Sequence, residues 1–257
     1  MLRTASDIKG YTLGASDGAV GAVSDLLFDD ATWLVRWLVI DTGQVLPGRK
    51  VLLPPSALGH VNPVGHQLAV RLTMQQVKDS PDIDADAPVS RRMETSLYDY
   101  YDWSPYWSTG FFLGGFGYPG GLVGLPLSEA IAPSVPHDRA GDPHLRSVRE
   151  LTGYHMHARD GEIGHIDDFL VEDGDWSLRY VVAATQNWWP GKKVLMSPRS
   201  IVSIDWAERR VNLDVDRQTI KDGPAYDPST PIDRAYEAAF HRHYGQAATP
   251  TAGRVSA

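Results

Sequence analysis

Short segments in which apolar and polar residues alternate recur along the chain and predict β-strands. Residues 35–39 and 178–182 carry an apolar side chain at every second position, which is the period of a half-buried strand. Residues 68–72 and 211–215 show the same alternation, with Leu or Val at every second position. The chain is therefore expected to be mainly β.

The same pattern occurs twice, at an offset of 143 residues. At that offset residues 7–101 align with residues 150–244 without a gap, and about 28 of the 95 positions are identical. The shared positions are mostly turn and core residues, among them Trp33 and Trp176 and an Asp-Gly pair near the start of each unit. Because glycine accepts a positive φ, Asp-Gly between two apolar segments favours a tight hairpin. The alignment indicates a duplicated unit.

Each unit ends in a segment with helical spacing. Val89, Met93 and Leu97 recur every four residues after a connector rich in Pro and Asp, and residues 232–244 repeat this arrangement. The part before the helix holds five or six short strands in about 75 residues. So few residues cannot bury both faces of an open sheet, which favours closure into a small barrel.

The predicted architecture is two tandem small β-barrels, each followed by a short helix. The first barrel unit with its trailing helix covers residues 1–101, and residues 102–145 form a linker rich in Gly, Pro and aromatic residues. The second unit with its helix covers residues 146–245. The tail, residues 246–257, has little apolar content and is expected to be disordered.

The composition excludes several classes of function. The chain of 257 residues has a formal net charge of -8 and no dense block of Lys and Arg, so nucleic-acid binding is not expected. It contains no cysteine, which excludes disulfides, thiolate metal sites and thiol catalysis. The first residues lack the apolar run of a signal peptide or anchor. We therefore expect a cytoplasmic protein, with peripheral membrane contact as the alternative.

One motif occurs in both units. Residues 36–58 read RWLVIDTGQVLPGRKVLLPPSAL and residues 179–201 read RYVVAATQNWWPGKKVLMSPRSI. With the early Asp-Gly turn, these segments resemble the PRC-barrel domain, a family named from the cytoplasmic part of the H subunit of purple-bacterial photosynthetic reaction centres. The resemblance covers about residues 7–84 and 150–227. It implies two small β-barrels that act as a scaffold, without the H subunit's transmembrane helix.

Three histidines gather in the second unit: His155, His157 and His165. A metal site would require them to converge. With the Asp-Gly pair as a two-residue hairpin turn, His157 is predicted opposite Gly164, and His165 opposite Met156 on the other face of the sheet. We therefore predict separate, exposed histidines and no bound metal or other cofactor.

Two arginines occupy equivalent positions among apolar neighbours, and an aspartate recurs on each preceding strand. A guanidinium on a barrel wall needs partners for its donors. The sequence predicts a structural ion pair in each unit, Arg36 with Asp25 and Arg179 with Asp168. Contact with an anion or with a partner protein is the alternative.

The linker begins with a run of aromatic residues. Ten of the 25 aromatic residues of the chain fall within 21 consecutive positions. The candidate interaction surface consists of Trp103, Tyr106, Trp107, Phe111 and Phe112. We expect the first three to be largely buried, because exposed rings would form a patch that soluble monomers seldom tolerate. Membrane contact and stacking on a flat ligand are the alternatives.

No catalytic motif accompanies these features. The sequence has no Gly-rich phosphate loop, nucleophile elbow or H-E-x-x-H zinc motif. We predict a non-enzymatic interaction or scaffold protein that binds a protein partner or itself. The alternatives are an accessory protein of a membrane electron-transfer or photosynthetic assembly, as the resemblance suggests, and an enzyme of unrecognised type.

Overall fold

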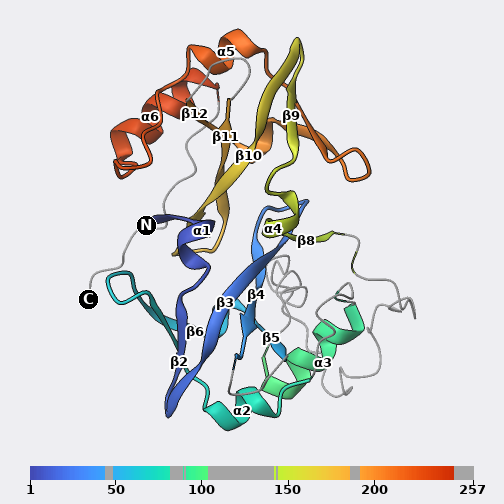
Figure 1. Ribbon diagram of the computed structural model, residues 1–257, viewed down its shortest axis with the longest axis vertical. Coiled ribbons are helices and arrows are strands. Elements are labelled where there is room, and N and C mark those ends of the chain that lie inside the picture. The colour runs from blue at the N-terminus through green and yellow to red at the C-terminus, as the bar shows by residue number, and fades with distance from the viewer. Residues whose placement is uncertain are drawn as a thin grey trace, which may run out of the picture.

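The computed structural model describes residues 1–43, 49–81, 89, 91–103, 142, 144–185 and 192–245. The Pro-Gly pairs of the repeated motif, at residues 47–48 and 190–191, and the tail lie outside these residues, as does nearly all of the aromatic linker. The described residues fold into two seven-stranded sheets with few helices, one above the other along the long axis of the molecule (Figure 1). This confirms the predicted mainly β fold class.

The first sheet has the strand order β5-β4-β3-β2-β7-β6. Its strands run β2 (Thr12–Ala15), β3 (Gly18–Asp29), β4 (Val35–Asp41), β5 (Lys50–Leu53), β6 (Leu58–Asn62) and β7 (Gln67–Val70). Only the short 3-10 helix η1 (Pro55–Ala57) separates β5 from β6 in the chain, although these strands are the two ends of the sheet. The ends must therefore lie close together, which curls the sheet around its core.

The second sheet repeats this order as β12-β11-β10-β9-β14-β13. Its strands run β9 (His155–Ala158), β10 (Gly161–Glu172), β11 (Leu178–Ala184), β12 (Lys193–Met196), β13 (Ile201–Asp205) and β14 (Arg210–Leu213), with η3 (Pro198–Ser200) between β12 and β13. Every bound equals its counterpart in the first sheet plus 143. The predicted offset therefore describes the backbone as well as the sequence.

Each unit receives its seventh strand from the chain segment that precedes the other unit. The short strand β1 (Leu2–Thr4) pairs antiparallel with β10 of the second sheet, and β8 (Leu145–Ser147) pairs with β3 of the first. The registers are equivalent, since Leu2 lies opposite Glu172 and Leu145 opposite Asp29. The two units are thus joined by a reciprocal strand exchange that the sequence did not indicate.

The exchange obeys an approximate two-fold symmetry. Leu34 and Ser177 are equivalent positions, and they form a β-bridge with each other. On either side of it the backbone N–H of Val35 donates to Trp176 at 2.9 Å, and that of Leu178 donates to Trp33 at 2.8 Å. One continuous hydrophobic core includes buried residues of both units. The two units therefore form one body.

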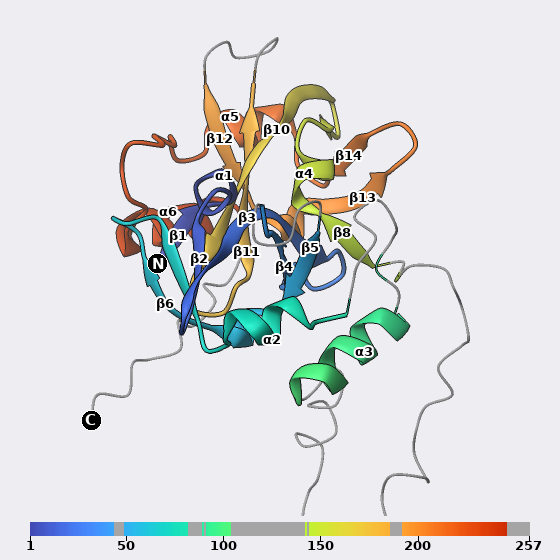
Figure 2. The same ribbon diagram turned by 60° about the horizontal axis from the view of Figure 1, so that its bottom comes forward.

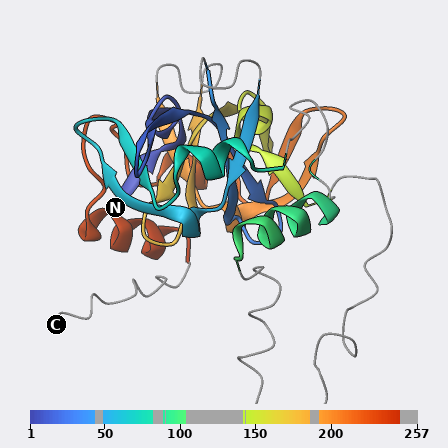
Figure 3. The ribbon, with the colours of Figure 1, turned by 90° about the horizontal axis from the view of Figure 1, so that it is seen from below.

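Short helices complete each unit at equivalent places. They are α1 (Ala5–Ile8), α2 (Met74–Lys78) and α3 (Arg91–Tyr101) in the first unit, and α4 (Val148–Leu151), α5 (Arg217–Lys221) and α6 (Arg234–His243) in the second. Helices α2 and α5 lie at opposite ends of the molecule (Figure 1), so α2 comes toward the viewer when the bottom is turned forward (Figure 2). Helices α3 and α6 lie on the same side of it (Figure 3). Helices α3 and α6 each bury one apolar face on the sheet of their own unit, as the helical spacing of their apolar residues predicted.

Candidate functional site

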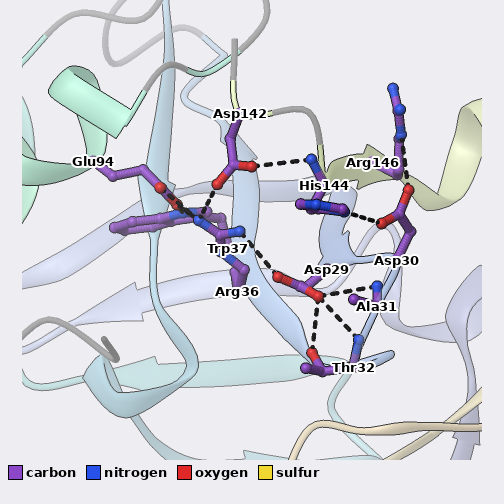
Figure 4. Close-up of polar contacts among 10 residues, drawn as sticks. All are labelled: Asp29, Asp30, Ala31, Thr32, Arg36, Trp37, Glu94, Asp142, His144 and Arg146. Carbon is purple, nitrogen blue, oxygen red and sulfur yellow. Dashed lines mark hydrogen bonds and ion pairs between the residues drawn. The ribbon is translucent and has the colours of Figure 1, made fainter. Parts of the chain in front are cut away.

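A buried ion-pair network is centred on Arg36 of β4, whose side chain is 5% exposed. Its Nη1 lies 3.3 Å from Oδ2 of Asp29, and its Nη2 lies 2.5 Å from Oε2 of Glu94 and 2.9 Å from Oδ2 of Asp142 (Figure 4). These carboxylates come from β3, from α3 and from the residues just before β8. One guanidinium therefore joins three parts of the chain that are far apart in sequence.

Glu94 is the most deeply buried member of the network, with no exposed surface. Its Oε1 also accepts a hydrogen bond from Nε1 of Trp37 at 2.6 Å. The ring of Tyr98 packs on Trp37 with 5.2 Å between centroids. Charge-assisted bonds and ring packing together fix α3 on the first sheet, since a buried carboxylate without donors would be costly.

The network continues toward β8 through the turn after β3. Oδ1 of Asp29 accepts hydrogen bonds from the backbone N–H groups of Ala31 and Thr32, which shape that turn (Figure 4). Asp30 lies 2.9 Å from Nδ1 of His144 and 3.3 Å from Nε of Arg146. The turn thus holds the start of the exchanged strand as well as Arg36.

Two described residues of the predicted linker, Trp103 and Asp142, are held by the first unit. Trp103 is half-buried and stacks on Tyr101 of α3 at 4.2 Å between ring centroids. Asp142 is buried against Arg36. The predicted surface residues Tyr106, Trp107, Phe111 and Phe112 lie outside the described residues.

The predicted partners of the two equivalent arginines are wrong. Asp25 lies opposite Val39 in the β3–β4 ladder, and Asp168 lies opposite Val182 in the equivalent ladder. The arginines stand three residues earlier on their strands, about 10 Å along the chain at the usual rise. Arg36 instead binds the three carboxylates described above, and Arg179 lies 3.2 Å from Asp175.

The two aspartates hold the strand exchange. Asp25 is buried and accepts hydrogen bonds from Oγ of Ser147 at 2.5 Å and from the backbone N–H of Arg149 at 3.1 Å. Asp168 accepts from the backbone N–H and the hydroxyl of Ser6. Each aspartate thus binds the segment contributed by the other half of the chain. The recurrence of this aspartate at the 143-residue offset was visible in the sequence. The residues that bind the aspartate could not be predicted from that recurrence.

The arginine of the second unit lies in a different environment. Arg179 of β11 is 20% exposed, and its guanidinium bonds Asp175 and Ser177, which precede the strand. Glu237, the equivalent of Glu94, instead lies 3.5 Å from the hydroxyl of Tyr180. Burial, followed by the charge of Glu237, raises the pKa of Tyr180, so its phenol stays neutral at ordinary pH. The ion pairs of Arg36 thus have no close counterpart around Arg179.

A pocket of about 280 Å³ lies beside Arg179, where the two units meet. Its walls come from the turn after β3, from β11 and the turn before it, from η3 and from α6. The lining residues are Thr32, Trp33, Leu34, Asp175, Ser177, Leu178, Arg179, Tyr180, Ser197, Pro198, Arg199 and His241. Sequence reasoning missed this pocket because its walls come from four separate stretches of the chain.

The predicted register of the histidines is wrong. His157 lies opposite Glu162 instead of Gly164, because Gly161 pairs with Ala158 and the turn falls one residue earlier than predicted. After a bulge between Glu162 and Gly164, His165 lies opposite His155 instead of Met156. A Cβ on Gly164 would lie 1.9 Å from the carbonyl oxygen of Ala184, so glycine permits this close backbone approach. His155 contacts Glu162 at 3.0 Å. Within the described residues no group of three or more metal-binding side chains is placed to hold an ion.

None of the described helices is both long enough and apolar enough to cross a lipid bilayer. This finding leaves the compartment of the protein as a prediction.

Comparison with known proteins gives the family. The PRC-barrel domain matches residues 2–73, a range that runs from β1 through β7. No curated protein matches the chain. The second sheet has the strand order of the matched one, with every element displaced by 143 residues. Residues 2–73 therefore match the PRC-barrel domain, and a second unit of the same strand order follows them.

Proposed function

We propose that this chain is a non-enzymatic interaction protein whose two-unit body presents the aromatic segment after Trp103 to a protein partner. The observation that carries the proposal is that Arg36 binds Glu94 and Asp142 at once. Glu94 belongs to the helix that leads into the segment, and Asp142 follows the segment. One buried group therefore holds both of its ends.

The physical cost of this arrangement supports a positional role. Burying an arginine with several carboxylates costs desolvation energy, and apolar residues of similar volume often give equal or greater stability. Such networks are useful where a particular geometry must be kept. Here the geometry is the spacing between the end of α3 and the start of β8.

The composition of the segment supports a protein partner. Phe111 and Phe112 stand in a stretch with many Gly and Pro residues and only a few charged ones. Aromatic side chains are enriched at the centres of protein interfaces, where a few of them supply most of the binding energy. A segment of this composition, anchored at both ends, suits recognition better than catalysis.

The proposal is tested with three variants of the full chain in chemical crosslinking and mass spectrometry from the source cells. Phe111→Ser with Phe112→Ser removes the aromatic side chains, and Asp142→Asn weakens one anchor. Val64→Ser is the control, because Val64 is 91% exposed on the turn between β6 and β7. Sedimentation velocity on each purified protein reports self-association.

We expect the aromatic variant to lose one crosslinked partner, or its own dimer, while its unfolding midpoint stays unchanged. Asp142→Asn should weaken the same interaction about tenfold, and Val64→Ser should leave it intact. If the aromatic variant keeps every interaction but unfolds earlier, the segment serves packing and the proposal is wrong.

A further inference from the structure

We propose that the pocket beside Arg179 binds a small organic oxyanion with a flat, apolar body. The lining of the pocket does not include Arg36 or any of its three carboxylate partners. The proposal follows from three observations: the cations that line the pocket, its apolar walls, and a comparison with the equivalent place in the first unit.

Three cationic or potentially cationic side chains line this one pocket. Arg199 is exposed, and its guanidinium makes no ion pair within the described residues. Arg179 uses Nε and one Nη for Ser177 and Asp175, which leaves its other Nη without a hydrogen bond in the described part of the chain. The one carboxylate of the lining, Asp175, is itself 53% exposed. The pocket is thus locally positive in an acidic protein.

His241 lines the pocket from α6. Its Nδ1 is buried and so does not border the open space. The donors that an oxyanion in the pocket could use are the guanidinium groups of Arg179 and Arg199.

The apolar walls define the rest of the ligand. Leu34, which is 43% exposed, and Trp33 reach the pocket from the first unit. Pro198 and Tyr180 line it from the second unit. Flat apolar surfaces of this kind suit an aromatic or planar body. A volume of about 280 Å³ accommodates a ligand with a single ring rather than a dinucleotide.

The first unit supplies an internal comparison. At the 143-residue offset, Arg199 corresponds to Ser56 and His241 corresponds to Tyr98. Tyr98 packs on Trp37, and the guanidinium of Arg36 is bound by carboxylates. The side chains that make the pocket of the second unit cationic are therefore absent from the equivalent positions of the first unit, although the strands and helices of the two units correspond.

The test is calorimetric titration of the full chain with phenyl phosphate, alongside two simpler probes. Benzyl alcohol keeps the ring without the charge, and inorganic phosphate keeps the charge without the ring. Arg199→Ser and His241→Tyr introduce the residues of the first unit. Arg242→Ser is the matched control, because Arg242 is an exposed arginine next to His241 that does not line the pocket.

We expect phenyl phosphate to bind once per chain with a Kd below about 1 mM, and each simpler probe to bind at least about tenfold more weakly. Arg199→Ser should weaken binding about tenfold or more, whereas Arg242→Ser should change it less than about twofold. His241→Tyr should weaken binding as well, because it places a larger side chain in the lining. The proposal is overturned if phenyl phosphate fails to bind below about 10 mM, if Arg242→Ser weakens binding as much as Arg199→Ser, or if inorganic phosphate binds as tightly as phenyl phosphate.

Discussion

The two units of this protein share a backbone but use the same arginine in different ways. Arg36 is buried among three carboxylates, whereas Arg179, at the equivalent position, lies at the edge of a pocket. Part of the difference arises outside the aligned repeat, because Asp142, which binds Arg36, lies before the second aligned unit. Part arises within it, because Glu237, the equivalent of Glu94, lies beside Tyr180. The comparison shows that a duplicated fold keeps its core while residues next to the repeat give equivalent side chains separate roles.

The largest expected effect comes from removing each arginine in turn. Arg36→Ala should lower the free energy of unfolding by about 3–5 kcal/mol, because it leaves Glu94 and Asp142 as buried charges without their partner. Arg179→Ala should cost less than about 1 kcal/mol, since its partner Asp175 is half exposed and can be hydrated. Urea unfolding of the two variants measures both values.

A second substitution tests how much of the stability lost in Arg36→Ala comes from unpaired buried charge and how much from lost packing. Glu94→Gln in the Arg36→Ala background should restore part of the lost stability, because it removes one of the uncompensated charges. Equal losses for Arg36→Ala and Arg179→Ala would mean that the two environments do not differ energetically and would contradict the comparison.

A smaller difference is expected at the strand exchange. Asp25→Asn should cost about 1–3 kcal/mol, because a buried carboxylate loses charge-assisted bonds from Ser147 and Arg149. Asp168→Asn should cost less than about 1 kcal/mol, because Asp168 is only partly buried and water can replace the lost bonds. Hydrogen exchange should show faster opening of β8 in the first variant. Equal protection of β8 and β1 in both variants would contradict this prediction.

The smallest difference between the two units is expected for the buried tyrosines Tyr101 and Tyr244, whose effects on stability at high pH should be alike. Burial raises the pKa of Tyr101 on α3 and of the equivalent Tyr244 beside α6 to about 12 in each case. An unfolded tyrosine has a pKa of about 10, so the folded state holds these protons more tightly. Stability is therefore complete below about pH 10 and is lost as the pH rises from about 10 to about 12.

Each tyrosine should contribute at most about 1.4 kcal/mol per pH unit to this loss. Tyr101→Phe and Tyr244→Phe should each remove a similar part of the alkaline decline, as measured by unfolding at a series of pH values. A decline that only one of the two substitutions reduces would show that the helices pack differently in the two units.

The sequence alone determined the repeating parts of this protein. Strands, the trailing helices and the 143-residue offset follow from local periodicity and turn residues, which depend on side chains within a few positions of each other. The motif at residues 36–58 is likewise a local pattern, and the family that it resembles is the one whose domain matches residues 2–73. Local chemistry also indicated that Arg36 and Asp25 need partners, because buried charges rarely remain unpaired.

Only the tertiary structure decided which groups those partners are. Glu94 and Asp142 reach Arg36 from 58 and 106 residues away, and Ser147 reaches Asp25 from a distance of 122 residues. The histidine register depended on a bulge beside Gly164, whose close approach to Ala184 is itself a contact between strands. The exchange of β1 and β8 has no local signal, because three residues of either strand could pair with the edge of either sheet until the whole chain had packed. Periodicity specifies elements, whereas the choice among distant partners is made by burial and hydrogen bonding in the assembled core.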